Sequence, residues 1–519
     1  MEPYSRNYRA SRRRRADAAE VRVRGQRSDR GHQGIPRALA RRPLVGMATL
    51  FKYLLRWLRN LQPCRRPLRV AQIGALLICV ATATAQAQTV YIWTGDNGRN
   101  GWSKKKNWLN DIAPIPGRNV WLQFRGNIDP IDFNDFANGS DFAGFIFSGT
   151  TTPFFLSGNS IDLFGGVYNL DTYSQTVSFD SLNLAGAAVD FGNIGDLTVT
   201  SPLVGSGALI KTMSGTLFLQ GANSYTGGTE IREGTIEIAA PQNLGSGPLT
   251  LAGGALRINN PGTSVVTLPQ NIVVEAPSTM TVAQGEAILS GAISGDSRLI
   301  VSGAGILHAT VDSAAFTSGI DVQSATLLLT GTRYVPVDVH GGEADIDGSV
   351  GDVHAFDGGT VGVGDPLAAA TLRTLNFILD AGARLSLDIG GTTPGATIGG
   401  HDRLNVFGSV SLGGTLDLEM LSGYIPNFGE RFFLISNDGT DPIAGAFGNA
   451  PNGGIVSNGS LTFSVSYNGD AATGQTVGGN DLVIIRIPSI PETRAVSLGG
   501  VGMLVLLRSR RRMRARRSI

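Results

Sequence analysis

Three acidic residues in the stretch GGEADIDGS (341–349) have the type and spacing that acid–base chemistry on sugars requires. Glu343, Asp345 and Asp347 are two positions apart, so they share one face of a β-strand. Paired carboxylates supply the acid and the base or nucleophile of glycoside hydrolases. A carbohydrate-active enzyme, a polysaccharide lyase or hydrolase, is therefore one alternative. The other is that these are solvated outward residues, because no basic partner stands nearby in the sequence.

Other residues with catalytic or ligating potential form no recognisable set. The triplet Gly295-Asp296-Ser297 is similar to the nucleophile block of certain esterases, but no Asp-x-x-His pair follows it. The sequence also has no phosphate-binding or dinucleotide-binding loop and no calcium nonapeptide array. We therefore expect no catalysis, no cofactor and no metal site. The five histidines are scattered without metal-ligand spacing: His32, His308, His340, His354 and His401.

The amino-acid composition indicates which secondary structure carries these acidic residues and histidines. The chain has 519 residues, 70 of them Gly, with 42% hydrophobic and 16% charged. It is too apolar to be disordered and too rich in Gly for helices, since Gly costs about 1 kcal/mol inside a helix. Many short strands joined by Gly, Asn and Asp turns are expected.

Residues 205–238, GSGALIKTMSGTLFLQGANSYTGGTEIREGTIEI, show how such strands are arranged. Leu209, Leu217, Leu219 and Ile231 share one parity, which is a period of two, and the run is too long for one strand. Inward Leu, Ile and Val would stack from coil to coil, while Thr, Ser and Lys face water and Gly forms the corners. The sequence predicts an all-β fold, a right-handed parallel β-helix (β-solenoid) rod with capped ends.

This stretch resembles the autotransporter-associated β-strand repeat, also called the passenger-associated transport repeat. The pattern G-x-G-x-L-x-K continues through G-x-N-x-Y-x-G-x-T-x-I, with Met213 in place of one Gly and Ile236 in place of the final Leu. A degenerate copy lies at 295–327, and residues 401–439 are similar to the segment that closes many such passengers. The resemblance implies an exported surface protein.

Four tryptophans gather between residues 93 and 121, upstream of the repeats. One interpretation is an aromatic platform for sugars, flanked by basic Lys104–Lys106. The other is an N-terminal cap, which the first coil needs whatever the function, because its strand edges would otherwise be exposed. We favour the cap. The tryptophans are Trp93, Trp102, Trp108 and Trp121.

The beginning of the chain has the parts of a secretory signal. Residues 1–46 are Arg-rich and read as a disordered leader or a start assigned too early, with Met47 as the alternative first residue. Residues 47–87 read as a signal peptide, with Ala85 and Ala87 forming the small-x-small site and cleavage before Gln88. Both cysteines precede that cut, so no disulfide is expected in the mature chain.

The segment 488–519 resembles the PEP-CTERM sorting tail of exported Gram-negative proteins. Pro491 and Glu492 precede a short apolar run, which is followed by an Arg cluster that would stay on the cytoplasmic side. The run is short for a span, so transient contact with the inner membrane is expected. The cluster begins with Arg508, Arg510, Arg511 and Arg512.

The remaining ranges are expected to form the β-helix. We assign 88–200 to the cap and first coils, 201–400 to the repeat-bearing coils and 401–487 to the last coils. Residues 88–507 hold 17 basic and 37 acidic side chains, which argues against nucleic acid as a partner.

The sequence thus predicts an elongated exported protein of the Gram-negative cell surface, outer membrane or extracellular matrix, acting in adhesion or envelope interaction. Its expected partners are the export and sorting machinery and exopolysaccharide or other surface glycans.

Overall fold

A computed structural model describes residues 87–95, 101–126, 131–262, 264–310, 315–332, 335–395, 399–459 and 461–488. Contacts divide the chain into 1–84 and 85–519, and every described residue belongs to the second unit. The leader, His32, Ala85, most of the signal peptide and the sorting tail from Pro491 onward lie outside the described residues.

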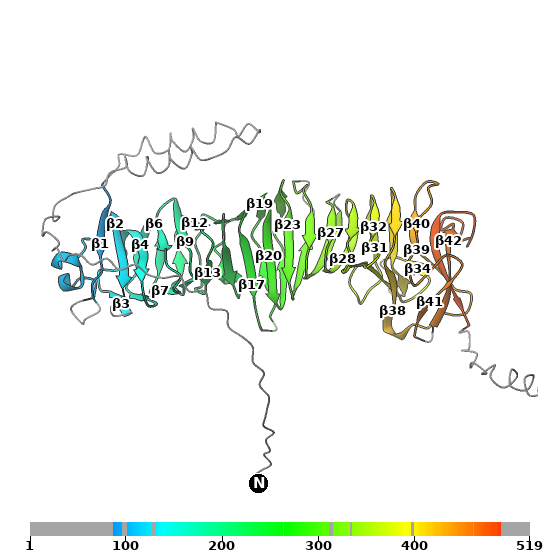
Figure 1. Cartoon of the computed structure of the whole chain (residues 1–519), viewed down its shortest axis with the longest axis horizontal. Coiled ribbons are helices and arrows are strands. Elements are labelled where there is room, and N and C mark those ends of the chain that lie inside the picture. The colour runs from blue at the N-terminus through cyan, green and yellow to red at the C-terminus, as the bar shows by residue number, and fades with distance from the viewer. Residues whose placement is uncertain are drawn as a thin grey trace, which may run out of the picture. The chain divides into compact units, whose positions relative to one another are not determined.

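The described chain consists of short strands, with successive coils adding one strand to each of two sheets (Figure 1). The first sheet has 12 described strands: β1 (Thr89–Ile92), β2 (Gly117–Gly126), β4 (Ser140–Thr150), β6 (Ile161–Asn169), β8 (Leu182–Leu184), β9 (Ala188–Asn193), β11 (Leu203–Val204), β12 (Ala208–Thr212), β14 (Thr229–Ile231), β16 (Leu249–Ala252), β19 (Ile272–Ala276) and β22 (Ile293–Gly295).

The second sheet continues from coil to coil with 15 described strands: β3 (Ile131–Asn134), β5 (Phe155–Gly158), β7 (Gln175–Phe179), β10 (Leu197–Val199), β13 (Thr216–Leu219), β15 (Thr235–Ile238), β17 (Ala255–Asn259), β20 (Ser278–Gln284), β23 (Leu299–Gly303), β25 (Ile320–Val322), β27 (Val337–Val339), β29 (Val353–Ala355), β32 (Phe377–Leu379), β37 (Val410–Leu412) and β40 (Ala444–Gly445).

The third sheet begins as the first one ends, and its 16 described strands are β18 (Val266–Leu268), β21 (Glu286–Leu289), β24 (Ile306–Thr310), β26 (Thr326–Thr332), β28 (Gly342–Ser349), β30 (Gly359–Gly362), β31 (Thr371–Thr374), β33 (Arg384–Ile389), β34 (Thr393–Pro394), β35 (Gly400–His401), β36 (Arg403–Val406), β38 (Thr415–Met420), β39 (Arg431–Asn437), β41 (Ile455–Asn458), β42 (Leu461–Gly469) and β43 (Asp481–Ile487). Four 3₁₀ turns, η1 (Lys105–Asn107), η2 (Leu109–Asp111), η3 (Pro241–Asn243) and η4 (Leu421–Gly423), are the helical elements among the described residues. In this part of the chain we find no helix with the length and apolarity needed to cross a membrane.

Alternation of buried and half-exposed side chains explains why these segments are strands. In β13 and its parallel neighbours, Leu217 pairs with Leu197 on one side and with Ile236 on the other, and all three side chains are fully buried. The predicted all-β parallel β-helix is therefore confirmed. Inward apolar columns of this kind are the main stabilising feature, because each coil buries its neighbours' apolar surface.

The repeat residues with polar side chains hold the coils together. Asn223 accepts a hydrogen bond from the Leu203 amide and donates one to the Asn243 carbonyl, so it links two neighbouring coils. The Tyr225 hydroxyl lies 2.6 Å from Thr229 Oγ1 in a fully buried position. These side chains are therefore committed to the architecture.

Lys211 corrects the expectation that Lys of this repeat faces water. Its side chain is fully buried, and its Nζ donates hydrogen bonds to the carbonyl oxygens of Thr212, Met213 and Glu233. The ammonium group supplies a donor to these three carbonyls, and a buried carbonyl requires one. Burial lowers the pKa of Lys211 to about 8.

Both ends of the β-helix are closed by different structures. At the N-terminal end, Trp93 and Trp108 pack edge to face with ring centroids 5.0 Å apart, and Trp102 is fully buried beneath them. At the C-terminal end, β39, β43, β42 and β41 pair antiparallel and interrupt the parallel ladder. Such ends leave fewer free strand edges for pairing with another chain.

Candidate functional site

The outward carboxylates of β28 lie on one face, as predicted, with Ala344 and Ile346 buried inward. Their environments differ, however. Glu343 and Asp347 are half-exposed, whereas Asp345 is only 7% exposed although it points away from the core. The interpretation of all three as solvated surface residues is therefore wrong for Asp345.

Two segments leave the ladder near Asp345: the first lines the pocket that contains Asp345, and the second leads to Asp402, which lines the same pocket. The chain after β30 turns back across the outer face of the third sheet between residues 363 and 370, and β34 and β35 form a second excursion after β33. Asp402 joins the two, because its carboxylate accepts hydrogen bonds of 2.7 Å from the amides of Ala370 and Asp388. The result is a pocket on the outer face of the sheet.

This acidic pocket has a volume of about 340 Å³ and contains carboxylates from several coils. Asp388 pairs directly with Glu419 across β33 and β38, and Asp345 pairs with Gly362. Gly362 gives the carboxylate room, because a Cβ there would lie 1.9 Å from Asp345 Oδ1. The charged residues that line the pocket are Glu343, Asp345, Asp388, Asp402 and Glu419.

Burial and mutual repulsion raise the pKa values of the carboxyl groups in the acidic pocket. The pKa of Asp345 rises to about 7 through burial and the charges of Glu343, Asp388 and Asp365. Burial, with the charges of Glu419 and Asp365, raises the pKa of Asp388 to about 7. At neutral pH these groups therefore exist in both protonation states, so they can donate or accept hydrogen bonds and exchange protons.

Asp402 has a different role from the other two buried carboxylates. Burial raises its pKa to about 8, although its two backbone hydrogen bonds act in the opposite direction. Those bonds occupy both carboxylate oxygens. Asp402 is thus a positioning residue that fixes the walls of the pocket.

Sequence reasoning found Glu343 and Asp345 but missed Asp388, Asp402 and Glu419. These three follow Asp345 by 43 residues or more, and no spacing rule connects them to it. One sequence feature could have pointed to Asp402. In HDRL (401–404) this acidic residue directly precedes β36, a strand with alternating buried positions. Asp347 lies on β28 but does not line the pocket.

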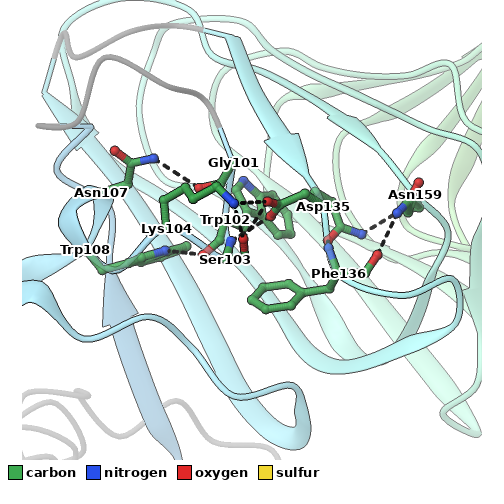
Figure 2. Close-up of polar contacts among 10 residues, drawn as sticks. Gly101, Trp102, Ser103, Lys104, Asn107, Trp108, Asp135, Phe136 and Asn159 are labelled. Atoms are coloured by element: carbon green, nitrogen blue, oxygen red, sulfur yellow. Dashed lines mark hydrogen bonds and ion pairs between the residues drawn. The ribbon is translucent and has the colours of Figure 1, made fainter.

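Three of the four tryptophans at the other end of the described chain are buried and so present no face to a sugar. Trp93, Trp102 and Trp108 are at most 1% exposed, and Trp108 Nε1 donates a 2.7 Å hydrogen bond to the Trp102 carbonyl (Figure 2). Lys104 forms an ion pair with Asp135, whose carboxylate also accepts hydrogen bonds from Ser103 (Figure 2). These contacts build the cap.

The remaining chemical candidates form no catalytic set among the described residues, although the rings of His340 and His354 both stack on Phe356. Ser297 donates its hydroxyl hydrogen bond to the Glu275 carbonyl. His308, His340 and His354 each contact one carboxylate, that of Glu286, Asp321 and Asp380 respectively. Over the described ranges no three His, Cys, Asp or Glu side chains are arranged to hold a metal ion.

Comparison with known proteins finds a family match in two successive coils of the β-helix, β12–β13 and β14–β15. Residues 209–238 match the family described as Passenger-associated-transport-repeat. This segment of the chain is therefore similar to a passenger-associated transport repeat. It covers β12 to β15, where Lys211, Asn223 and Tyr225 make the contacts described above.

A curated relative is consistent with this match. The chain is 31% identical over 257 residues, 46% of its length, to a protein named "Adhesin BmaC autotransporter" from Brucella suis biovar 1 (strain 1330). The chain spans only 7% of that relative's length. No solved structure matches this chain.

Proposed function

We propose that this chain is an exported β-helical protein with an adhesin-like role in surface contact and no catalysis. The observation that carries the proposal is the match of residues 209–238 to the transport repeat, in two β-helix coils where Lys211, Asn223 and Tyr225 make buried packing contacts. The similarity to an autotransporter adhesin supports it. Such a ladder presents its outward side chains over many coils, which suits display.

The place of action follows from the two ends of the sequence. We propose removal of a signal peptide before Gln88 and temporary retention through 488–519, with processing near Pro491 and Glu492. The protein then reaches the cell surface, outer membrane or extracellular matrix of a Gram-negative cell. Its proposed partners there are surface glycans or exopolysaccharide.

Fractionation and binding tests on cells examine this proposal. Cells producing the full chain should carry it at the surface and adhere more strongly to glycan-coated surfaces than cells without it. Deletion of residues 491–519 should release the β-helix to the periplasm or medium and abolish the gain in adhesion. Identical partitioning of both forms would contradict the role of the tail, and unchanged adhesion without the protein would contradict the adhesin-like role.

A glycoside hydrolase is the second candidate, favoured because carboxylates from separate coils line one pocket. A polysaccharide lyase is disfavoured, because its uronate substrate would be repelled by five acidic side chains in the pocket. Release of reducing ends from neutral or cationic polysaccharides, lost in Asp388→Asn, would support hydrolysis.

A further inference from the structure

Asp345 and Asp388 are buried carboxylates without a partner. They are 7% and 5% exposed, and no described residue donates a hydrogen bond to either side chain. Both line the acidic pocket. A buried carboxylate without a donor or a counter-charge is costly, so a group from outside the chain would gain by supplying one.

The charge of the pocket selects a cation as that group. Among its described lining residues are five carboxylates and no Lys, Arg or His. The charge of Arg384 acts on Glu343, but its guanidinium is already paired with Asp417. A positive ligand would form charge-assisted hydrogen bonds with Asp345 and Asp388 and reduce the repulsion between them.

An organic cation suits the pocket better than a metal ion. No cluster of ligating side chains in the described ranges has the arrangement to hold a metal. The volume of about 340 Å³ falls at the lower end of small-molecule sites and far exceeds one ion. Leu367 (84% exposed), Met420 and Leu421 also line the pocket and offer apolar surface to a carbon skeleton.

The polar groups of the pocket favour a sugar as that skeleton. Ser386, Ser422 and the exposed Glu419 also line the pocket and can bond hydroxyl groups. We propose that the acidic pocket binds an amino-sugar unit of a glycan through its free ammonium group, with Asp345 and Asp388 as the acceptors. The proposal names the ligand class of the glycan contact proposed above and rests on that function for its biological setting.

Calorimetric titration of the purified full chain tests the proposal at pH 7, where a fraction of the sugar amines and of the pocket carboxyl groups carry their charges. The probes are a glucosamine tetramer with free amines, its fully N-acetylated counterpart, a glucose tetramer and n-butylamine. We expect the free-amine tetramer to bind at least tenfold more tightly than each of the other three. Equal binding of the acetylated tetramer would overturn the ammonium contact, and equal binding of n-butylamine would overturn recognition of the sugar.

Three single substitutions place the site. Asp345→Asn and Asp388→Asn should each weaken binding of the free-amine tetramer at least tenfold, while Asp347→Asn, on the same face of β28 but outside the pocket, should leave it unchanged. Melting temperatures confirm that each variant is folded. An equal effect of all three substitutions, or no effect of any, would overturn the assignment. Because export and adhesion are measured on cells, their failure is distinguishable from a failure of binding by the purified chain.

Discussion

Asp402 accepts a 2.7 Å hydrogen bond from the backbone amide of Asp388, 14 residues earlier in the chain. The amide of Asp402 in turn donates to the Asp388 carbonyl at 2.8 Å. This reciprocal pair fixes the start of β36 against the end of β33. The same carboxylate also binds the amide of Ala370, so a single side chain fixes two segments that leave the ladder.

Substitution to Asn should affect stability differently at Asp402, which positions the pocket walls, and at Asp345, whose carboxylate accepts no hydrogen bond from a described residue. In Asp402→Asn the amide nitrogen cannot accept, so one buried backbone donor loses its partner, and we expect a loss of about 1–3 kcal/mol in the free energy of unfolding. Asp345→Asn removes a buried negative charge that has no donor, so this variant should be as stable as the parent chain or more stable at pH 8. Urea unfolding measures both. Equal destabilisation by the two substitutions would contradict the distinction.

The raised pKa values of the acidic pocket predict a pH dependence of stability. Asp345, Asp388 and Asp402 have pKa values of about 7, 7 and 8 in the folded chain, above the ordinary value of 3.8. The folded state therefore binds more protons between pH 4 and 8, so their contribution to stability is full below pH 4 and is lost as pH rises through 8.

Thermal melts at pH 5 and pH 8.5 check this dependence. The melting temperature should be lower at pH 8.5, and Asp345→Asn should reduce the difference. As a control, Asp347→Asn should leave the difference as it is in the parent chain. A larger difference in Asp345→Asn than in the parent would show that other groups dominate.

The inward parity of the repeat predicts unequal effects of adjacent substitutions. Leu217 is fully buried and Thr216 is half-exposed on the other face of β13. Leu217→Asp buries a carboxylate without a partner, so it should lower the free energy of unfolding by several kcal/mol. Thr216→Asp should change stability by about 0.5 kcal/mol or less. Similar shifts in melting temperature for both variants would refute the inward assignment of Leu217.

Met213 occupies a backbone conformation that favours glycine. Its φ is +63°, and the repeat pattern has Gly at this position. Left-handed backbone costs a residue with a side chain about 1 kcal/mol, so Met213→Gly should raise the free energy of unfolding. The neighbouring Ser214→Gly has no such strain to relieve and should lower it. Chemical denaturation of both variants tests this, and a loss of stability in Met213→Gly would show that its side-chain contacts outweigh the strain.

Local alternation was sufficient to predict the repetitive part of the fold. The parity of Leu209, Leu217 and Ile231 places each side chain on the inner face, because side chains of a strand alternate and the buried face must be apolar. The same rule placed Glu343 and Asp345 together on the outer face of β28. The four tryptophans likewise indicated a cap, since three of them are buried there.

Only the tertiary structure determined the surroundings of the side chains on each strand face. Lys211 has inward parity, yet its burial is favourable because the carbonyls of Thr212, Met213 and Glu233 accept its hydrogen bonds at the corner. The acidic pocket, which contains Asp345, depends on excursions of the chain that bring Asp402 to Asp388. Sequence by itself determines which side of a strand a residue occupies. Whether that side is solvent or a pocket depends on segments far along the chain, whose contacts no local period encodes.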